Sequence, residues 1–209
     1  MTTTVVLARH GRTSWHHPNR YTGRSDIGLD DVGTDQARAL AAWAPSQGFT
    51  SLASSHLSRA VATLAPVAAA LGQPPAVDPR LRELDFGIAE GRTLADVRAD
   101  RPDVADRFVA DPSGDHFPGG EAPPDAVTRA MAGLGDLVTA DPGGRILVVA
   151  HSTLIRLLVC AVLGVPLGDY RRRLPSLDPV STTTFRFSGG DGPVALLAYN
   201  VPVSRGWTA

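Results

Sequence analysis

The pattern of apolar and polar positions predicts short buried strands separated by amphipathic helices. Residues 4–8 form a continuous aliphatic and β-branched run, typical of a strand buried on both faces. Residues 145–150 have the same character and form the clearest strand in the sequence. Apolar residues recur at helical spacing between about residues 31 and 44. Further strands are predicted at 51–54, 181–187 and 194–199, and further helices at 58–72, 126–140 and 154–163.

Strands that alternate with helices predict an α/β fold. We expect three layers, α/β/α, with a mostly parallel central sheet covered on both faces. Residues 84–125 break the pattern with many Pro, Gly and Asp residues, as in DPSGDHFPGGEAPP. We interpret this segment as a cap inserted into a single domain of residues 1–209, since neither a repeat nor a long linker divides the chain.

Composition and charge exclude several classes of protein. Hydrophobic residues make up 43% of the chain, enough for one sizeable core, and the net charge is −1 with both signs scattered. A nucleic-acid partner is not expected, because such proteins usually carry a basic stripe. No run approaches the ~20 apolar residues of a membrane span, and the N-terminus does not resemble a secretory signal. The sequence therefore predicts a soluble protein without a membrane partner.

The single cysteine, Cys160, excludes an internal disulfide and suits a reducing cytoplasm. It lies in the apolar run LIRLLVCAVLG, so we expect a buried, inert thiol.

Two of the predicted strands end in histidine, at His10 and His151. Ligands of open α/β sheets bind at the carboxyl edge of the strands, where these side chains are expected. Arg9 offers donors matched to phosphate oxygens, and Gly11 lets the backbone approach a ligand closely. Each residue alone would fit a structural role, such as a strand-end ion pair for Arg9. Together they indicate an anion-binding site.

The motif RHGRT at residues 9–13 resembles the signature of the histidine phosphatase superfamily, also called the phosphoglycerate mutase-like family. Four further segments resemble this family in the same order: YTGRSD with LDDVGTDQARALA, LASSHLSRAVATLAPVAAALG, LRELDFGIAEG and ILVVAHSTLIRLLVCAVLG. Because ordered motifs extend over nearly the whole chain, the resemblance is specific.

The resemblance implies a phosphomonoesterase that needs no cofactor and no metal. His10 would be the nucleophile and form a phosphohistidine, oriented by Gly11 or a nearby carbonyl. Arg9, Arg59 and His151 would stabilise the charge on the transferring phosphoryl group. Glu83 would protonate the leaving alkoxide.

Without the resemblance, Glu83 would be interpreted as an ion-pair partner of Arg80 or Arg82. Glu90 and Asp85 are the alternatives for the role of the acid.

Other positions match the family less closely. Thr22 and Gly23 correspond to positions that touch the substrate through side-chain and backbone groups, and Thr13 follows the signature. His16 stands where many members carry Asn, and Ser152 stands where Gly is usual. We expect both replacements to tune substrate choice, and the charge of His16 to vary with pH.

The histidines do not have the spacing of a metal site, because no cysteine or close acidic cluster joins them. The five considered are His10, His16, His17, His116 and His151.

Hydrolysis is favoured over phosphoglycerate mutase-type transfer. Family mutases resemble one another in a Glu-x-x-Tyr-Gly pattern, whereas here Phe86 takes the place of the tyrosine. They also carry an adjacent Arg pair in the cap, but the cap arginines here, Arg92, Arg98, Arg101 and Arg107, are all separated. A non-catalytic phospho-ligand binding protein on the same fold is the third alternative.

A cap of this size favours a small phosphorylated metabolite as substrate. Phe86, Phe108, His116 and Phe117, with Arg20 and Arg24 near the mouth, would suit a sugar, sugar acid or alcohol. The sequence leaves open the particular ester, whether the protein is a monomer or a homodimer, and the role of Trp207 in the C-terminal PVSRGWTA.

Overall fold

A six-stranded sheet forms the centre of the computed structural model, which describes residues 1–192 and 194–203. Trp207 lies outside the described residues. The strands are β1 (Thr3–Arg9), β2 (Ser51–Ser54), β3 (Ala76–Val77), β4 (Arg145–Ala150), β5 (Thr182–Phe187) and β6 (Val194–Val201), in the spatial order β3-β2-β4-β1-β5-β6. The pairs β3–β2, β2–β4 and β4–β1 are parallel, whereas β1–β5 and β5–β6 are antiparallel. The sheet is therefore mixed, with its parallel part around the two strands that end in histidine.

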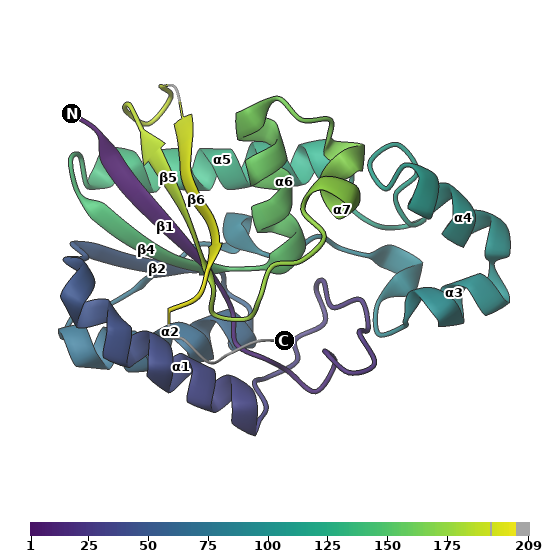
Figure 1. Cartoon of the computed structure of the whole chain (residues 1–209), viewed down its shortest axis with the longest axis horizontal. Coiled ribbons are helices and arrows are strands. Elements are labelled where there is room, and N and C mark those ends of the chain that lie inside the picture. Colours follow the sequence, from purple (N-terminus) through teal and green to yellow (C-terminus); the bar gives the residue numbers. More distant parts are fainter. Residues whose placement is uncertain (193, 204–209) are drawn as a thin grey trace.

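Helices cover both faces of this sheet. They are α1 (Asp31–Trp43), α2 (Ser58–Leu71), α3 (Leu94–Asp100), α4 (Pro102–Ala110), α5 (Pro123–Ala140), α6 (Ser152–Leu163) and α7 (Tyr170–Arg173). Figure 1 shows α1 and α2 on one side of the sheet and α5 and α6 on the other. Successive side chains of a strand point to opposite faces, so Val5 and Leu7 pack with α5 and α6 while Val6 and Ala8 pack with α1 and α2. This confirms the three-layer α/β/α prediction.

Most predicted elements are present, with differences at their ends. Helix α5 begins at Pro123, three residues before the predicted start, because proline suits the first turn of a helix. The predicted cap limit at residue 125 therefore falls inside α5. Helix α6 begins at Ser152 rather than at residue 154. The two-residue β3 and the four-residue α7 were not predicted, since neither is long enough to show a periodic pattern.

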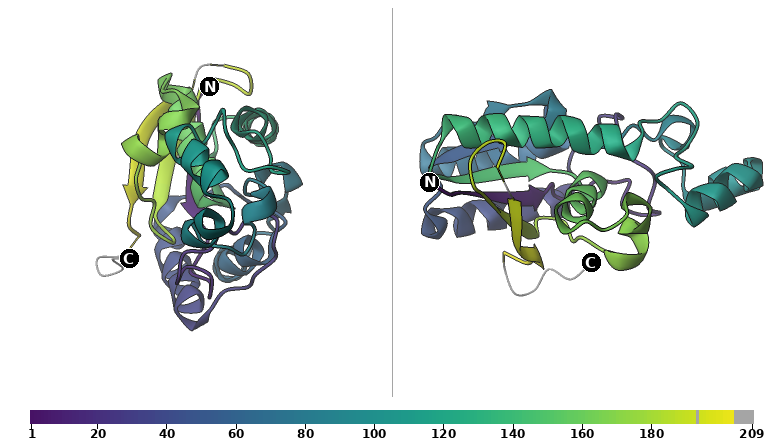
Figure 2. Two further views of the ribbon diagram at one scale, coloured as in Figure 1. Left: turned by 90° about the vertical axis from the view of Figure 1, so that its right-hand side faces the viewer. Right: turned by 90° about the horizontal axis from the view of Figure 1, so that it is seen from above.

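The segment between β3 and α5 carries α3 and α4, which project from one end of the molecule (Figures 1 and 2). Phe108 and Phe117 stack inside it with their ring centroids 3.9 Å apart. Tyr21, from the loop after β1, packs its ring against both, at 5.8 and 5.0 Å. The projecting segment and the loop after β1 are thus joined by aromatic packing.

Within the described residues, no helix combines the length and the apolar character needed to cross a membrane. Cys160 is a buried free thiol, as expected.

Candidate active site

The sheet brings the two strand-end histidines together. Strands β1 and β4 are parallel neighbours that pair Arg9 with Ala150, so the next residue of each leaves the sheet at the same edge. The rings of His10 and His151 lie with their centroids 5.2 Å apart, and the ring of His16 lies 5.8 Å from that of His10.

His10 is held as an oriented, neutral imidazole. Its Nδ1 lies 2.7 Å from the carbonyl oxygen of Gly11, and because a carbonyl can only accept, Nδ1 carries the proton. Burial, followed by the charge of Arg59, lowers the pKa of His10 well below its usual value. The other ring nitrogen, Nε2, therefore keeps a lone pair that can attack an electrophile.

His151 is completely buried and is held by Ser55, whose Oγ lies 2.7 Å from Nε2. The backbone N–H of Leu57 donates to the same Oγ, so the O–H of Ser55 is available to donate a hydrogen bond to Nε2. Nδ1–H is then left as a donor without a partner among the described residues. Burial and the nearby Arg59 lower the pKa of His151 well below its usual value, which favours this neutral form.

Arg9 and Arg59 are fixed by backbone carbonyls rather than by carboxylates. Arg9 donates from Nη1 to Leu177 O at 2.5 Å, and Arg59 donates to Ser25 O and Gly23 O, both at 2.8 Å. The Nε of each arginine is buried and has no acceptor among the described residues. A buried donor without a partner costs about 1–3 kcal/mol, which an anion bound beside it would offset.

Burial and the charge of Arg156 lower the pKa of Arg9 to about 10, so Arg9 stays charged at neutral pH.

His16 contacts Arg9, and the His16 ring stays neutral near neutral pH. Its Nε2 lies 2.6 Å from Nη2 of Arg9. The backbone N–H of Thr13 donates to its Nδ1 at 3.1 Å, and the Oγ1 of Thr13 lies 3.1 Å from the same nitrogen. Burial and the charge of Arg9 lower the pKa of His16 to about 3. The expectation of a pH-dependent charge at this position is therefore wrong.

Glu83 binds the start of α6 instead of an arginine side chain. Its carboxylate accepts N–H groups from Leu84 (3.0 Å), Thr153 (2.9 Å) and Leu154 (3.0 Å), so it satisfies two free donors of the helix N-terminus. Arg129 donates to the carbonyls of residues 80, 82 and 83 and fixes the backbone there.

The suggested ion pairs of Glu83 are absent from the described residues. Arg80 pairs with Asp78 and Asp136, and Arg82 pairs with Glu121.

The two alternative acids, Glu90 and Asp85, hold loops. The carboxylate of Glu90 accepts backbone N–H groups at positions 23, 24, 25 and 86 and the hydroxyl of Ser25. Asp85 accepts the N–H of Gly87 and pairs with Arg24 at 3.4 Å. Glu90 thereby shapes the loop whose carbonyls hold Arg59, a role that spacing in the sequence could not indicate.

The expected substrate-binding positions divide into two groups. Thr22 and Ser152 line the pocket described below. Gly23 is not among its lining residues: its N–H donates to Glu90, and its carbonyl accepts from Arg59. A Cβ at position 23 would lie 2.0 Å from Leu84 O, so glycine is required there for close packing.

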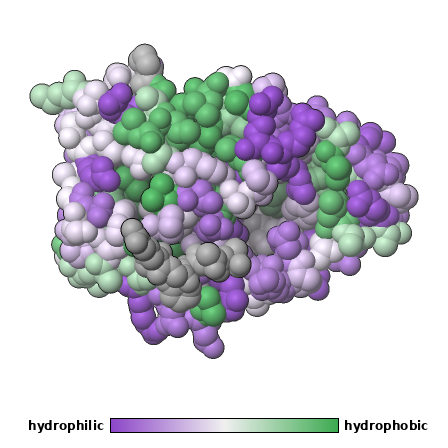
Figure 3. Space-filling model, in the orientation of Figure 1, coloured by the Kyte–Doolittle hydropathy of each residue, from purple (hydrophilic) through white to green (hydrophobic). Residues whose placement is uncertain are grey.

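His10, Arg9, His16 and Glu83 line a cavity of about 590 Å³, within the range of small-molecule sites. In Figure 3 the surface is hollowed below the hydrophilic residues that cover α7. Sequence reasoning missed much of the wall: Trp15, Asn19, Tyr21, Arg156, Tyr170, Arg171 and residues 175–178. Arg20 lines the cavity as expected, but Arg24 does not.

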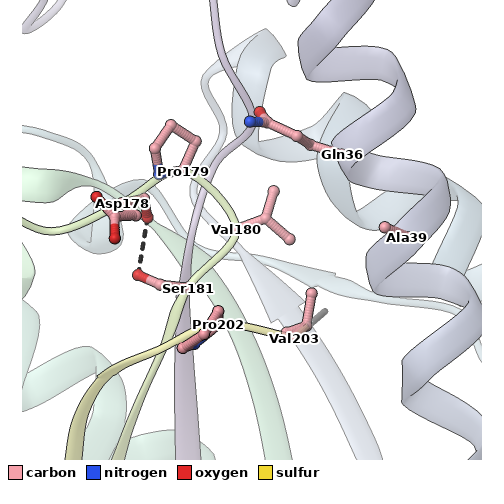
Figure 4. A pocket seen from close by; sticks show the side chains of 8 residues that line it. All are labelled: Gln36, Ala39, Asp178, Pro179, Val180, Ser181, Pro202 and Val203. Carbon is pink, nitrogen blue, oxygen red and sulfur yellow. Dashed lines mark hydrogen bonds between the residues drawn. The ribbon is translucent and has the colours of Figure 1, made fainter. Parts of the chain in front are cut away.

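A second hollow lies between α1 and the segment after α7, lined by Gln36, Ala39, Val180 and their neighbours (Figure 4). Its volume of about 10 Å³ would hold at most one water molecule, so it is not a candidate substrate site. In the described part of the chain, no three His, Cys, Asp or Glu side chains are grouped as metal ligands.

Comparison with known proteins agrees with this geometry. Residues 5–200 match the histidine phosphatase superfamily (branch 1). A relative in Enterobacter sp. (strain 638), named "Probable phosphoglycerate mutase GpmB", is 34% identical over 168 residues, which cover 80% of this chain and 78% of the relative.

Solved structures give the same result. A mycobacterial glucosyl-3-phosphoglycerate phosphatase superposes with a TM-score of 0.86 at 27% identity, covering 96% of this chain and 100% of the other. A phosphoserine phosphatase of Entamoeba histolytica, in complex with 3-phosphoglyceric acid, gives 0.82 at 25% identity, covering 95% and 96%. Both its sequence and its fold show that the chain belongs to the histidine phosphatase superfamily.

Proposed function

We propose that this protein is a phosphomonoesterase that hydrolyses a small phosphorylated metabolite through a phosphohistidine on His10. One observation carries the proposal. A neutral histidine, oriented for attack through Nε2, lies with its ring 5.2 Å from that of His151, and the charge of Arg59 acts on it. Three buried donors of these residues and of Arg9 have no protein acceptor among the described residues: Arg9 Nε, Arg59 Nε and His151 Nδ1. A phosphoryl group supplies the electrophile for His10 and the acceptor oxygens for the donors.

In the first step Nε2 of His10 attacks phosphorus, the ester P–O bond breaks and the new P–N bond forms. The arginines and His151 stabilise the charge on the phosphoryl oxygens throughout. The carboxyl group of Glu83 gives a proton to the leaving alkoxide. In the second step Glu83 takes a proton from water, which attacks phosphorus and releases His10 and inorganic phosphate. Binding at the N-terminus of α6 holds Glu83 at the cavity wall during both steps.

The similarity to glucosyl-3-phosphoglycerate phosphatase and phosphoserine phosphatase supports a small metabolite as the substrate. We propose that residues 84–122 act as the cap that selects it, since Phe86 and Leu94 of this segment line the cavity. The arginines and histidines take the place of a metal, so a chelator such as EDTA should leave the rate unchanged. The single cysteine supports a reducing, cytoplasmic location.

Phosphoglycerate mutase activity is the second candidate, favoured by the similarity to the 34% identical relative named "Probable phosphoglycerate mutase GpmB". Phe86 lines the cavity but carries no hydroxyl, unlike the tyrosine of the mutase pattern. Incubation with 3-phosphoglycerate distinguishes the two activities. A phosphatase releases inorganic phosphate, whereas a mutase accumulates 2-phosphoglycerate when primed with 2,3-bisphosphoglycerate.

The test of the proposal is the hydrolysis of p-nitrophenyl phosphate by His10→Ala. We expect kcat to fall roughly a thousandfold or more, because the covalent route is lost. His56→Ala is the matched control, since His56 is exposed and should tolerate the same truncation. Unchanged turnover by His10→Ala would reject the proposal, and a complete lack of turnover by the unsubstituted protein would favour the non-catalytic binding alternative.

The intermediate can be trapped directly. After brief incubation with ³²P-labelled substrate and a quench in base, label should remain on the protein and be released by acid, as expected for a phosphoramidate. Label on His10→Ala, or label stable to acid, would place the intermediate on another residue.

A further inference from the structure

Four arginine side chains line the cavity, but the proposed phosphoryl site uses only Arg9 of these. Arg20 approaches Asp96 at 3.9 Å. Arg156 and Arg171 make no ion pair within residues 1–192 and 194–203, although Arg172 and Arg173, next in the chain, both pair with Asp169. The two cavity-facing arginines thus differ from their neighbours in lacking a protein anion.

Arg156 lies one helical turn after Ser152 on α6 and is fixed in place by neutral groups. Its Nε donates to Ser152 O at 3.3 Å, Nη1 donates to Leu174 O at 3.2 Å, and its guanidinium carbon lies 4.7 Å from the ring centre of Tyr170. Nη2 has no partner among these contacts. The arginine is therefore held rigidly at the wall with an edge available to a ligand.

Arg171, on α7, is fixed in the same manner. Its Nη1 donates to the hydroxyl of Tyr21 at 3.2 Å, and its guanidinium lies 5.3 Å from the ring centre of Phe108 in the cap. Tyr21 also lines the cavity. The guanidinium is thus positioned by aromatic groups that do not neutralise it.

Arg156 lies close to Arg9 of the proposed phosphoryl site. Arg156 and Arg9 donate to carbonyls of the same short segment, at positions 174 and 177. Burial lowers the pKa of Arg9, and the charge of Arg156 lowers it further. The acidic residues lining the cavity are Glu83, which is bound to three backbone N–H groups, and Asp178, which lies near Asn200. Neither forms an ion pair with these arginines in the described part of the chain.

We propose that Arg156 and Arg171 form a subsite for a second anionic group, so that the substrates are phosphomonoesters that also carry a carboxylate or a second phosphate. This inference rests on the proposed phosphatase function and narrows its substrate class. Like charges held together without counter-ions are unfavourable in the free protein, and a ligand with two anionic groups would relieve both positive regions at once. A guanidinium fork also matches the planar oxygens of a carboxylate or phosphate.

Paired substrates test this subsite. Phosphate release is measured with 3-phosphoglycerate, with glycerol 3-phosphate, in which CH₂OH replaces the carboxylate, and with propane-1,3-diol bisphosphate. We expect kcat/KM for 3-phosphoglycerate to exceed that for glycerol 3-phosphate by roughly ten- to a hundredfold, mainly through KM, as charge-assisted hydrogen bonds imply. The bisphosphate shows whether a phosphate substitutes for the carboxylate.

Arg156→Gln and Arg171→Gln should each lower the ratio of kcat/KM for 3-phosphoglycerate to kcat/KM for glycerol 3-phosphate about tenfold or more. Arg172→Gln is the matched control, because Arg172 lies on the same short helix with its side chain 80% exposed and should leave the ratio unchanged. Equal kcat/KM for the acid and the alcohol in the unsubstituted protein, or equal losses on both in the variants, would overturn the subsite and assign the two arginines to packing.

Binding separates this result from a failure of the proposed function. Calorimetry with His10→Ala measures the affinity for the same three compounds without turnover. Tighter binding of 3-phosphoglycerate and of the bisphosphate than of glycerol 3-phosphate, lost in His10→Ala/Arg156→Gln, supports the subsite even if the chain hydrolyses none of the three compounds. Equal affinity for 3-phosphoglycerate and glycerol 3-phosphate rejects the subsite even if hydrolysis is rapid.

Discussion

Glu83→Gln tests the dual position of this residue, which both binds the start of α6 and lies at the cavity wall. In the structure Oε1 accepts the N–H groups of Leu84 and Leu154, and Oε2 accepts that of Thr153. Glutamine keeps one oxygen and presents an NH₂ group in place of the other. At least one buried N–H then faces another donor, since the side chain is only 5% exposed.

The magnitude follows from these contacts. A buried donor without an acceptor costs about 1–3 kcal/mol. The loss of a negative charge at a helix N-terminus costs about 0.3–2 kcal/mol more. We therefore expect the free energy of unfolding to fall by roughly 1.3–5 kcal/mol, measured by urea denaturation with an unchanged m-value.

Asp125→Asn is the matched control for the charge. Asp125 lies in the first turn of α5 but is exposed, so its neutralisation should cost no more than about 1 kcal/mol. If Glu83→Gln lowers the free energy of unfolding less than Asp125→Asn does, the hydrogen bonds from the buried N–H groups to Glu83 do not stabilise the start of α6.

The activity of the same variant tests the proposed acid role at a temperature where the protein remains folded. Alkyl phosphates need a proton on the leaving oxygen, whereas p-nitrophenolate leaves readily without one. Glu83→Gln should therefore lower kcat for an alkyl ester roughly tenfold or more beyond its effect on the aryl ester. Equal losses on both esters would contradict proton donation and leave only the structural role.

Three further predictions follow from the site. The pKa values of His10, His16 and His151 are lowered in the fold, so the unfolded chain binds more protons below about pH 6.5 and stability is lost as pH falls. Each should contribute about 1 kcal/mol between pH 6.5 and 5.5, about 3 kcal/mol in total, and a flat urea-denaturation profile over this interval would contradict the three shifts. Gly23→Ala should destabilise the protein by about 1–3 kcal/mol and lower kcat, because its Cβ would overlap the backbone at position 84 and displace the loop that holds Arg59; a thermal melt like that of the parent would disprove this. Ser55→Ala should lower kcat on aryl phosphate about tenfold, since it releases the ring of His151, and should cost about 1–3 kcal/mol of stability, since it removes the partner of buried polar groups; unchanged kinetics would show that this ring is positioned by packing alone.

The sequence predicted the layers of the fold well because those layers depend on local patterns. The buried strands at residues 4–8 and 145–150 and the helix at 31–44 have a continuous or periodic apolar pattern, and the structure has β1, β4 and α1 at those places. The two residues of β3 and the single helical turn of α7 each span about one period, so neither repeats a pattern. The start of α5 was misplaced because Pro123 was interpreted as part of the loop, whereas it begins the helix.

The wall of the cavity illustrates the limit of sequence reasoning most clearly. Arg171 and Tyr21 are 150 positions apart in the chain and meet only because α7 and the loop after β1 lie at the same end of the sheet. Nothing in the sequence near Arg171 distinguishes it from Arg172 and Arg173, which pair with Asp169 on the surface. Only the folded structure shows which of the three faces the cavity.

The sequence alone determined which strands end in histidine, and therefore which edge of the sheet carries the chemistry, because side-chain order along a strand is fixed by the covalent chain. It could not determine the protonation of His16, the partners of Glu83 or the surroundings of Arg156. Those properties depend on burial and on donors supplied by other elements, such as Arg9 at the end of β1 for His16 and the first turn of α6 for Glu83. A hydrogen bond or a low dielectric exists only once the fold has brought its parts together, and for that reason the tertiary structure decided them.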